Sequence, residues 1–180
     1  MTISSNSFPP KAHGFQPDYF AKSIFEVDFM TLQARGVKNL VLDVDHTVAE
    51  YNALSLDAKT QDFLTGIVRT GKIEKIYLAS NSKRDLSGMA SSIGATVIRP
   101  IIARKPSPYF YRRIQAVIGG RPEDSVMVGD KIVTDIWGGN RAGFMTVLVE
   151  PIGPEIPIDR LLMRRFWGRM YLRSKNRPES

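Results

Sequence analysis

Two acidic residues and a hydroxyl follow an apolar run in the first third of the chain, in the order Asp43, Asp45 and Thr47. Residues 40 to 42 are all aliphatic, which is typical of a strand covered on both faces of a parallel sheet. Alternation along an extended strand would send Asp43 and Asp45 to the same side. Two carboxylates aimed at one spot repel each other unless a cation or a shared proton relieves them, so the pair indicates a divalent metal site. On its own, this pattern is also that of an ordinary acidic turn after a strand.

Polar residues that could do chemistry also follow later strand-like segments. In chain order these are Ser80 with Asn81 after residues 75 to 79, Lys105 after residues 96 to 98, and Asp130 with Asp135 after residues 125 to 128. Each has an ordinary explanation, since serine and asparagine favour turns, a lysine before proline is usually solvated, and an aspartate after glycine can cap a helix. Those explanations do not account for the shared position of the groups at the carboxyl ends of expected parallel strands. Together they supply acids for a metal, a hydroxyl and a cation, which a phosphoryl group requires.

Strand-like and helix-like segments alternate along the chain after residue 16. The expected strands are residues 40 to 42, 75 to 79, 96 to 98, 125 to 128 and 145 to 149. The expected helices are residues 17 to 27, 28 to 36, 57 to 71, 85 to 93, 107 to 118 and 134 to 142. This alternation implies right-handed crossovers, with helices on both faces of a parallel sheet. The predicted fold class is α/β, a Rossmann-like three-layer sandwich with a five-stranded parallel sheet.

Some helix signals make specific predictions. The first helix is predicted from Pro17, which suits a first helical position, and from apolar residues at spacings of four and three, namely Phe20, Ile24 and Val27. Asp28 and Asp57 are expected to be the N-caps of the next two helices. The helix over residues 107 to 118 is expected to bury one stripe of side chains, namely Phe110, Ile114 and Val117.

Length and composition exclude several classes of protein. The 180 residues favour one domain with its own core, and the absence of cysteine excludes disulfides, thiolate nucleophiles and cysteine metal sites. No apolar run approaches the roughly 18 residues that span a bilayer, and residues 1 to 15 lack the pattern of a signal peptide, so we expect a cytoplasmic protein. The net charge of +7 indicates an anionic partner, which could be a nucleic acid, a lipid headgroup or a small phosphate.

The ends of the chain differ from its centre. We expect a flexible arm over residues 1 to 16, a catalytic domain over residues 17 to 150, and a proline-containing link with a basic amphipathic helix over residues 151 to 180. This helix could lie on an anionic membrane surface through Arg160, Arg164, Arg165 and Arg169. Alternatively, it could pack its apolar side on the domain and expose the arginines to water. The run lacks the glycine-interleaved aromatic residues of a stacking platform, which argues against nucleic acid as the partner.

In this order, the polar groups resemble the four signatures of the haloacid-dehalogenase-like (HAD) phosphatase superfamily. They stand here as Asp43-Val44-Asp45-His46-Thr47, Ser80-Asn81, Lys105-Pro106 and Gly129-Asp130-x4-Asp135. More narrowly, the chain is similar to the YqeG branch, whose members include phosphatidylglycerophosphate phosphatases. That similarity is carried by the entry segment 17 to 36, the turn Gly138-Gly139-Asn140-Arg141-x-Gly143 and the basic tail. His46 and Ser82 stand where the family usually has asparagine.

The resemblance implies a role for each of these residues. Asp43 would be the nucleophile that forms an aspartyl-phosphate intermediate, and Asp45 would be the general acid and then the general base. Mg²⁺ would be held by the carboxylates of Asp43 and Asp130 and the backbone carbonyl of Asp45, with Asp135 in support. The groups that would bind the phosphate are Thr47, Ser80, Asn81 and Lys105. Lys105 would also keep Asp43 ionised.

The spacing of the signatures bears on the substrate. The intervals between residues 47 and 80 and between residues 80 and 105 each hold one helix and its strands, which leaves no room for a cap domain. An open site suits a phosphate carried on something large, and the first hypothesis is a magnesium-dependent phosphatidylglycerophosphate phosphatase at the inner face of the membrane. The alternatives are a HAD phosphatase for a soluble sugar or nucleotide phosphate or a nucleic-acid end, and a non-catalytic binding module. The intact acid pair and Lys105 argue against the binding module.

Overall fold

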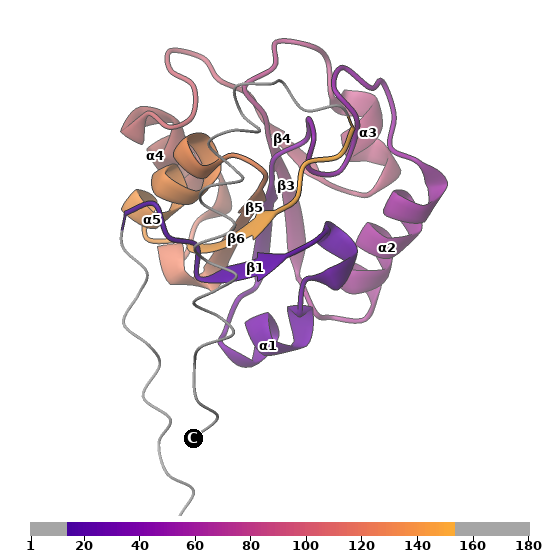
Figure 1. The fold of residues 1–180 in the computed structure, drawn as a ribbon, viewed down its shortest axis with the longest axis horizontal. Coiled ribbons are helices and arrows are strands. Elements are labelled where there is room, and N and C mark those ends of the chain that lie inside the picture. The colour runs from indigo at the N-terminus through magenta and orange to yellow at the C-terminus, as the bar shows by residue number, and fades with distance from the viewer. Residues whose placement is uncertain (1–13, 154–180) are drawn as a thin grey trace, which may run out of the picture.

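The computed structural model describes residues 14 to 153, in which six parallel strands form one sheet in the order β1-β6-β5-β2-β3-β4 (Figure 1). They are β1 (Tyr19–Ala21), β2 (Asn39–Leu42), β3 (Lys75–Ala79), β4 (Thr96–Ile98), β5 (Ser125–Gly129) and β6 (Met145–Val149). All five strands expected from the sequence are present, and β1 adds a sixth at one edge. In the middle of the sheet, Leu42 of β2 pairs with Leu78 of β3 and Val128 of β5.

The helices cover both faces of the sheet, as the sequence predicts. On one face lie α1 (Phe29–Ala34), α2 (Ala58–Arg69) and α3 (Ser87–Ser92), and on the other lie α4 (Pro108–Ile118) and α5 (Gly138–Ala142) (Figure 1). Shorter helical segments are η1 (Ile24–Glu26), η2 (Pro122–Asp124) and the π-helical η3 (Ile132–Trp137). The predicted N-caps are confirmed, because Asp28 accepts a hydrogen bond from the Thr31 backbone N–H and Asp57 accepts one from that of Thr60.

Two predictions for individual segments are wrong. Residues 17 to 27 contain strand β1 and the short η1 instead of one helix, since β1 pairs with β6 and the Asp18 carboxylate binds the backbone N–H of Thr146. The helical spacing here is misleading, because Phe20 is 40% exposed. In α4 the prediction that Val117 points inward is also wrong, since Val117 is 44% exposed and Tyr111 is buried instead.

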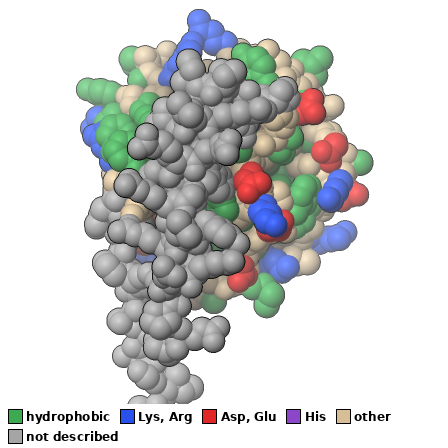
Figure 2. Space-filling view, in the orientation of Figure 1, with side chains coloured by type: hydrophobic (Ala, Val, Ile, Leu, Met, Phe, Trp, Pro, Cys, Tyr) green, Lys and Arg blue, Asp and Glu red, His purple; other side chains and the backbone are tan. Residues whose placement is uncertain are grey.

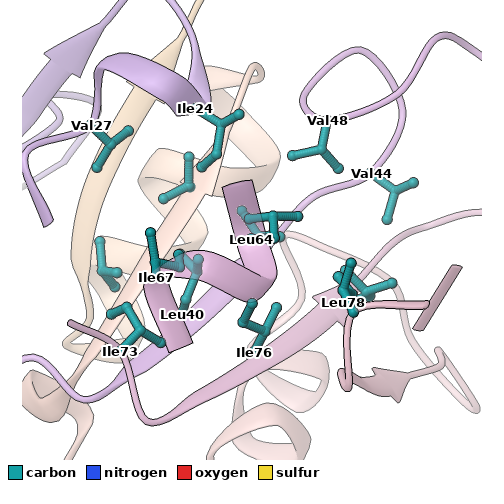
Figure 3. Packing of buried hydrophobic residues seen from close by; sticks show 14 of the residues in the cluster. Ile24, Val27, Leu40, Val44, Val48, Leu64, Ile67, Ile73, Ile76 and Leu78 are labelled. Carbon is teal, nitrogen blue, oxygen red and sulfur yellow. The ribbon is translucent and has the colours of Figure 1, made fainter. Parts of the chain in front are cut away.

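The larger core lies between the sheet and α1, α2 and α3. Figure 3 shows Leu64 and Ile67 of α2 packed among Leu40 of β2 and Ile76 of β3. The other core lies under α4 and α5 and contains Val41 of β2. Neighbouring residues of β2 therefore anchor opposite faces of the sheet, which fixes the carboxyl end of this strand from both sides.

The region where a cap domain could be inserted holds none. Between residues 43 and 105, all of which the structure describes, the connections contain α2 and α3 and no further domain. The carboxyl edge of the sheet is therefore not covered by an inserted domain. No described helix combines the length and the hydropathy that a membrane span requires. The predicted arm up to residue 13 and the predicted basic helix lie outside the described residues, and Gly14 and Gln16 contact the domain through the Asn140 side chain.

Candidate active site

Three aspartates from the carboxyl edge of the sheet meet in one buried cluster. The backbone N–H of Asp43 donates to the carbonyl oxygen of Val128 at 3.0 Å, which extends the contact between β2 and β5 by one residue. This bond places Asp43 beside Asp130, which directly follows β5. Asp135 follows in η3, and the three residues offer carboxylate oxygens that all lie within 4.8 Å of one another. The convergence predicted from the strand ends is therefore present.

The Lys105 ammonium group joins this cluster. Its Nζ lies 2.7 Å from Asp43 Oδ1 and 2.6 Å from Asp135 Oδ1, and the Lys105 side chain is only 2% exposed. Burial alone would lower the pKa of Lys105, but the carboxylates of Asp135 and Asp43 raise it above its ordinary value. Lys105 is therefore a fixed positive charge beside the predicted nucleophile.

The Asn81 side chain holds the backbone of Lys105 in place. Asn81 Nδ2 donates to the Lys105 carbonyl oxygen at 3.0 Å, and the Lys105 backbone N–H donates to Asn81 Oδ1 at 2.8 Å. Both functional groups of the Asn81 amide are thereby used within the protein. The structure thus gives Asn81 a role in positioning Lys105, whereas the sequence resemblance suggested contact with phosphate.

The charge balance of the cluster favours an additional cation. Burial raises the pKa of Asp135 to about 7, with Lys105 opposing and Asp43 and Asp130 adding to the rise. Burial also raises the pKa of Asp130, against the nearby Lys131 ammonium. Three carboxylates face two ammonium groups, and every offered ligand atom is oxygen. A hard divalent ion such as Mg²⁺ fits this donor set.

Asp45 lines a cavity at this edge of the sheet, but its carboxylate is not part of the cluster. Asp45 Oδ1 accepts a hydrogen bond from Arg84 Nη1 at 2.5 Å and another from the Asn52 backbone N–H at 3.0 Å. Asp43 and Asp45 line the same cavity, but β2 ends at Leu42 and Asp45 lies in the turn that follows, so strand alternation is not what brings the two together. The proposed metal contact through the Asp45 backbone carbonyl stays a prediction.

The two predicted hydroxyl ligands differ in position. Thr47 is buried, and its hydroxyl donates to Asp130 Oδ1 at 3.2 Å. Ser80 lines the cavity, and its Oγ accepts from the Ser82 backbone N–H at 3.1 Å. Ser80 is therefore placed to meet a bound group, while Thr47 orients an acid of the cluster.

The unusual His46 has a conformational explanation. Its φ of +65° lies in the left-handed region, which asparagine and histidine enter more readily than most residues. The ring stacks on Tyr51, and Nδ1 lies 2.8 Å from the carbonyl oxygen of Ile152. His46 can therefore replace asparagine here, and it ties the segment after β6 to the site.

Gly129 supports Asp135 in a way that the sequence motif alone does not explain. A Cβ atom on Gly129 would lie 2.4 Å from Asp135 Cγ, so a larger residue would displace this carboxylate. The Tyr111 hydroxyl donates to the Thr134 carbonyl oxygen at 2.5 Å, and Gly138 leaves room for the Tyr111 ring. The glycines near β5 thus permit the close packing that fixes Asp135.

Sequence reasoning missed Arg84 and Lys131. Arg84 forms the ion pair with Asp45, and Lys131 Nζ lies 3.2 Å from Asp130 Oδ2. Arg84 lies outside the signatures, a few residues after Ser80-Asn81, and Lys131 occupies a variable position within Gly129-Asp130-x4-Asp135. Lys131, Ser80 and Lys105 are among the residues that line a cavity of about 640 Å³ at this edge of the sheet.

Comparisons with known proteins agree with this fold. A family model described as HAD-hydrolase-like matches residues 102 to 151. The chain is 30% identical to "Probable phosphatase YqeG" of Bacillus subtilis (strain 168), over 77% of this chain and 78% of that protein. It is 31% identical to "Phosphatidylglycerophosphate phosphatase 1, chloroplastic" of Chlamydomonas reinhardtii, over 76% of this chain and 53% of that protein, so it spans about half of that relative.

A solved structure shows the same fold. The crystal structure of a HAD phosphatase from Thermococcus onnurineus matches with a TM-score of 0.50 and 14% identity, over 72% of this chain and 98% of that one. The parallel sheet and the acids and lysine at its carboxyl edge define a phosphatase of the HAD type. The chain belongs to the HAD superfamily of phosphatases, in its YqeG branch.

Proposed function

We propose that this phosphatase hydrolyses a phosphomonoester with Mg²⁺ bound, through an aspartyl-phosphate on Asp43, and that its substrate is phosphatidylglycerophosphate in the synthesis of phosphatidylglycerol. The main support for this chemistry is the group of charged side chains that surrounds Asp43. Its carboxylate lies 2.7 Å from Lys105 Nζ and within 4.8 Å of two further acids, at the edge of an open cavity.

The metal would be held by the carboxylates of Asp43, Asp130 and Asp135, with the Asp45 backbone carbonyl as a further oxygen ligand. Bound Mg²⁺ would neutralise charge on the phosphoryl oxygens as the phosphorus is attacked. Thr47 orients Asp130 within this set through its hydroxyl. Lys105 would then stabilise the negative charge on the transferring group beside Asp43.

The reaction would proceed in two displacements at phosphorus. In the first, an Asp43 carboxylate oxygen forms a bond to phosphorus, the bond from phosphorus to the ester oxygen breaks, and Asp45 gives its proton to the departing alkoxide. In the second, Asp45 takes a proton from water as the water oxygen attacks phosphorus. Inorganic phosphate leaves, and Asp43 is restored as a free carboxylate.

The lipid substrate is supported by the open site and by the relatives. No cap domain is inserted between residues 43 and 105 to close the cavity, so a phosphate that remains attached to a bilayer could enter it. The Chlamydomonas relative is named a phosphatidylglycerophosphate phosphatase. Peripheral attachment to the inner face of the membrane, helped by the predicted basic helix with Arg160, Arg164, Arg165 and Arg169, belongs to the same proposal.

A phosphate-release screen tests this function. Wild type and Asp43→Asn are compared on lipid, sugar and nucleotide monoesters, each with Mg²⁺ and with EDTA. We expect release from phosphatidylglycerophosphate that requires Mg²⁺ and is lost in Asp43→Asn while the circular dichroism spectrum is retained. Preference for a soluble phosphate would favour the alternative phosphatase. Absence of release from every substrate would favour a binding module, and activity in Asp43→Asn would exclude this nucleophile.

A further inference from the structure

Exposed hydrophobic side chains gather around the site. Ten large ones are exposed among residues 14 to 153, and six of these lie on segments that directly follow β2, β4 and β5. The six are Tyr51, Leu54, Ile101, Ile102, Tyr109 and Val133. Tyr51 and Val133 line the cavity, and the other four lie on segments that leave the same edge of the sheet, where the carboxyl ends of the parallel strands meet. Figure 1 draws the loops after β2 and β4 along the upper edge of the molecule.

The most exposed of these residues are adjacent in one loop. Ile101 and Ile102 are 71% and 95% exposed, and they lie between β4 and α4, two or three residues before the cavity-lining Arg104. Leu54, in the loop after β2, is 84% exposed. These side chains contribute little to the core, so packing within the described fold does not explain them. Exposed apolar groups clustered around a site indicate a surface for contact with a partner.

The charges beside these residues indicate what the partner is. Lys83, Arg104 and Lys131 line the cavity, and Lys83 and Arg104 are exposed. Glu50 is an exposed acid on the same edge, while Asp85 is paired with Arg99. Figure 2 shows hydrophobic and basic side chains along the upper edge of the molecule. A surface that combines apolar tips with basic groups suits the headgroup region of an anionic bilayer.

We infer that this surface, formed by the six hydrophobic residues together with Lys83, Arg104 and Lys131, docks on an anionic phospholipid bilayer. The apolar tips enter the boundary between headgroups and acyl chains, and the basic groups contact lipid phosphates. The mouth of the cavity then faces the bilayer, so a phosphorylated headgroup reaches Asp43 without leaving it. This inference deepens the proposed function, because it assigns the binding of lipid to the catalytic face itself.

The double variant Ile101→Ser/Ile102→Ser in the full chain tests the docking. Both side chains are largely exposed, so the change removes little packing, and Met30→Ser on α1, where Met30 is 68% exposed, is the matched control. Flotation is measured with vesicles of phosphatidylglycerol and phosphatidylcholine and with vesicles of phosphatidylcholine alone. We expect the double variant to lose about tenfold in partitioning onto the anionic vesicles, and Met30→Ser to match wild type. Flotation of the double variant equal to wild type would overturn the docking surface.

Activity separates this inference from the proposed substrate. The docking predicts that kcat/KM for phosphatidylglycerophosphate in vesicles falls in the double variant, while kcat/KM for p-nitrophenyl phosphate in solution is unchanged. If vesicle binding falls but no variant, wild type included, hydrolyses the lipid, the docking surface stands and the substrate proposal fails. If the lipid is hydrolysed equally by wild type and the double variant, the docking fails and the substrate proposal stands.

The guanidinium group of Arg84 binds Asp45 through one nitrogen. Its Nη1 lies 2.5 Å from Asp45 Oδ1, while Nε and Nη2 are buried without a hydrogen-bond partner within residues 14 to 153. Its backbone N–H donates to Ser82 Oγ at 3.2 Å, so the loop after β3 fixes the position of Arg84. The guanidinium and the Asn52 backbone N–H both bind Asp45 Oδ1, which leaves Oδ2 without a hydrogen bond to the described residues.

We propose that Arg84 is a positioning residue that aims Asp45 Oδ2 at the leaving group. The proposal rests on the proposed function, since it requires Asp45 to be the general acid. A charged group fixed on one carboxylate oxygen orients the other, which a proton transfer requires. The effect is greatest for an ester whose alkoxide must be protonated as it leaves.

This role is tested by measuring how kcat depends on the leaving group in three variants, Arg84→Met, Arg84→Lys and Asp45→Asn. We expect Arg84→Met to lose about 10- to 100-fold in kcat on an alkyl phosphate, with a smaller loss on p-nitrophenyl phosphate, whose leaving group needs no proton. Arg84→Lys or added guanidinium should restore part of the activity. Asp45→Asn is the reference, because loss of the general acid should lower kcat more on the alkyl phosphate than on p-nitrophenyl phosphate. If it does so, equal losses on both substrates in Arg84→Met would overturn the positioning role. If Asp45→Asn does not distinguish them, its role as general acid fails.

Discussion

Ion pairs lie at both ends of strand β2, and they differ most in their exposure to water. At the amino end, Lys38 Nζ lies 3.5 Å from Glu74 Oε1, and the two side chains are 56% and 63% exposed. At the carboxyl end, Lys105 contacts Asp43 and Asp135, and none of the three side chains is more than 7% exposed. Water and salt screen the first pair, whereas the second group interacts through a medium of low polarity.

This difference in exposure decides how much each ion pair matters to the stability of the fold. An exposed pair contributes between about 0 and 1 kcal/mol to stability, and either partner can be lost at little cost. Buried charges must be desolvated, and they are tolerated only where partners compensate them. The carboxyl end therefore holds charges that are unfavourable for folding by themselves and that are arranged for binding and reaction. On the side of the molecule with α1 and α2, acidic and basic side chains are interspersed on the surface (Figure 2).

The largest effect in this comparison is expected for Lys105→Met. The substitution leaves Asp43 and Asp135 buried without their ammonium partner, so we expect a loss of about 3 to 5 kcal/mol in the free energy of unfolding. Phosphatase activity should fall below detection at the same time. Urea unfolding and phosphate release measure the two effects. A variant as stable as wild type would show that the buried group is not coupled as described.

Gly129→Ala alters the carboxyl end without removing any charge. The new Cβ would lie 2.4 Å from Asp135 Cγ and must push this carboxylate out of the cluster. We expect activity to fall about 100-fold, because misplacing a group by about 1 Å can have an effect of this size. The matched control is Gly66→Ala in α2, where a Cβ meets nothing within 4 Å. Normal activity in Gly129→Ala would mean that Asp135 need not hold its position.

Mg²⁺ should stabilise the carboxyl end selectively. At a concentration of 100 times its dissociation constant, a ligand that binds only the folded state adds about 2.7 kcal/mol to stability. We expect a rise in Tm with Mg²⁺ in wild type, and a smaller rise in Asp130→Asn, which removes one of the three charged ligands. Differential scanning fluorimetry with Mg²⁺ and with EDTA measures this. The same rise in both proteins would place the cation elsewhere.

The smallest effect is expected for Lys38→Met at the amino end. The substitution removes the exposed pair with Glu74, so the free energy of unfolding should change by less than about 1 kcal/mol, with unaltered phosphatase activity. It introduces the same side chain as Lys105→Met and therefore serves as its matched control. An equal loss of stability in the two variants would remove burial as the reason for the difference between the ends of β2.

Much of the site follows from the sequence because strand ends in a parallel sheet are predictable. Asp43, Lys105 and Asp130 each follow a segment that is expected to be a strand, and parallel strands end at the same edge of a sheet. The strand ends predict the cluster of acids, and the short intervals between the signatures predict the absence of a cap domain between residues 43 and 105. The roles of these residues in the reaction stay predictions.

What the sequence does not predict depends on contacts between distant segments. The sequence predicts a helix where β1 lies, because the pairing of β1 with β6 and the hydrogen bond from the Thr146 backbone N–H to Asp18 join residues far apart in the chain. The partner of Asp45 was missed because Arg84 comes from another loop and belongs to no signature. Gly129 was recognised as part of a motif, but its physical reason, the nearby Asp135 side chain, is visible only in three dimensions.

The central claim is that Asp43 receives the phosphoryl group, and trapping the intermediate tests it most directly. Asp45→Asn, which should slow hydrolysis of the intermediate, is mixed with p-nitrophenyl phosphate and Mg²⁺, quenched in acid and treated with borohydride. Borohydride reduces an acyl phosphate, so peptide mass spectrometry should find homoserine at position 43, and none when Asp43 is also replaced by asparagine. Reduction at another residue, or its absence while phosphate is released steadily, would contradict the account.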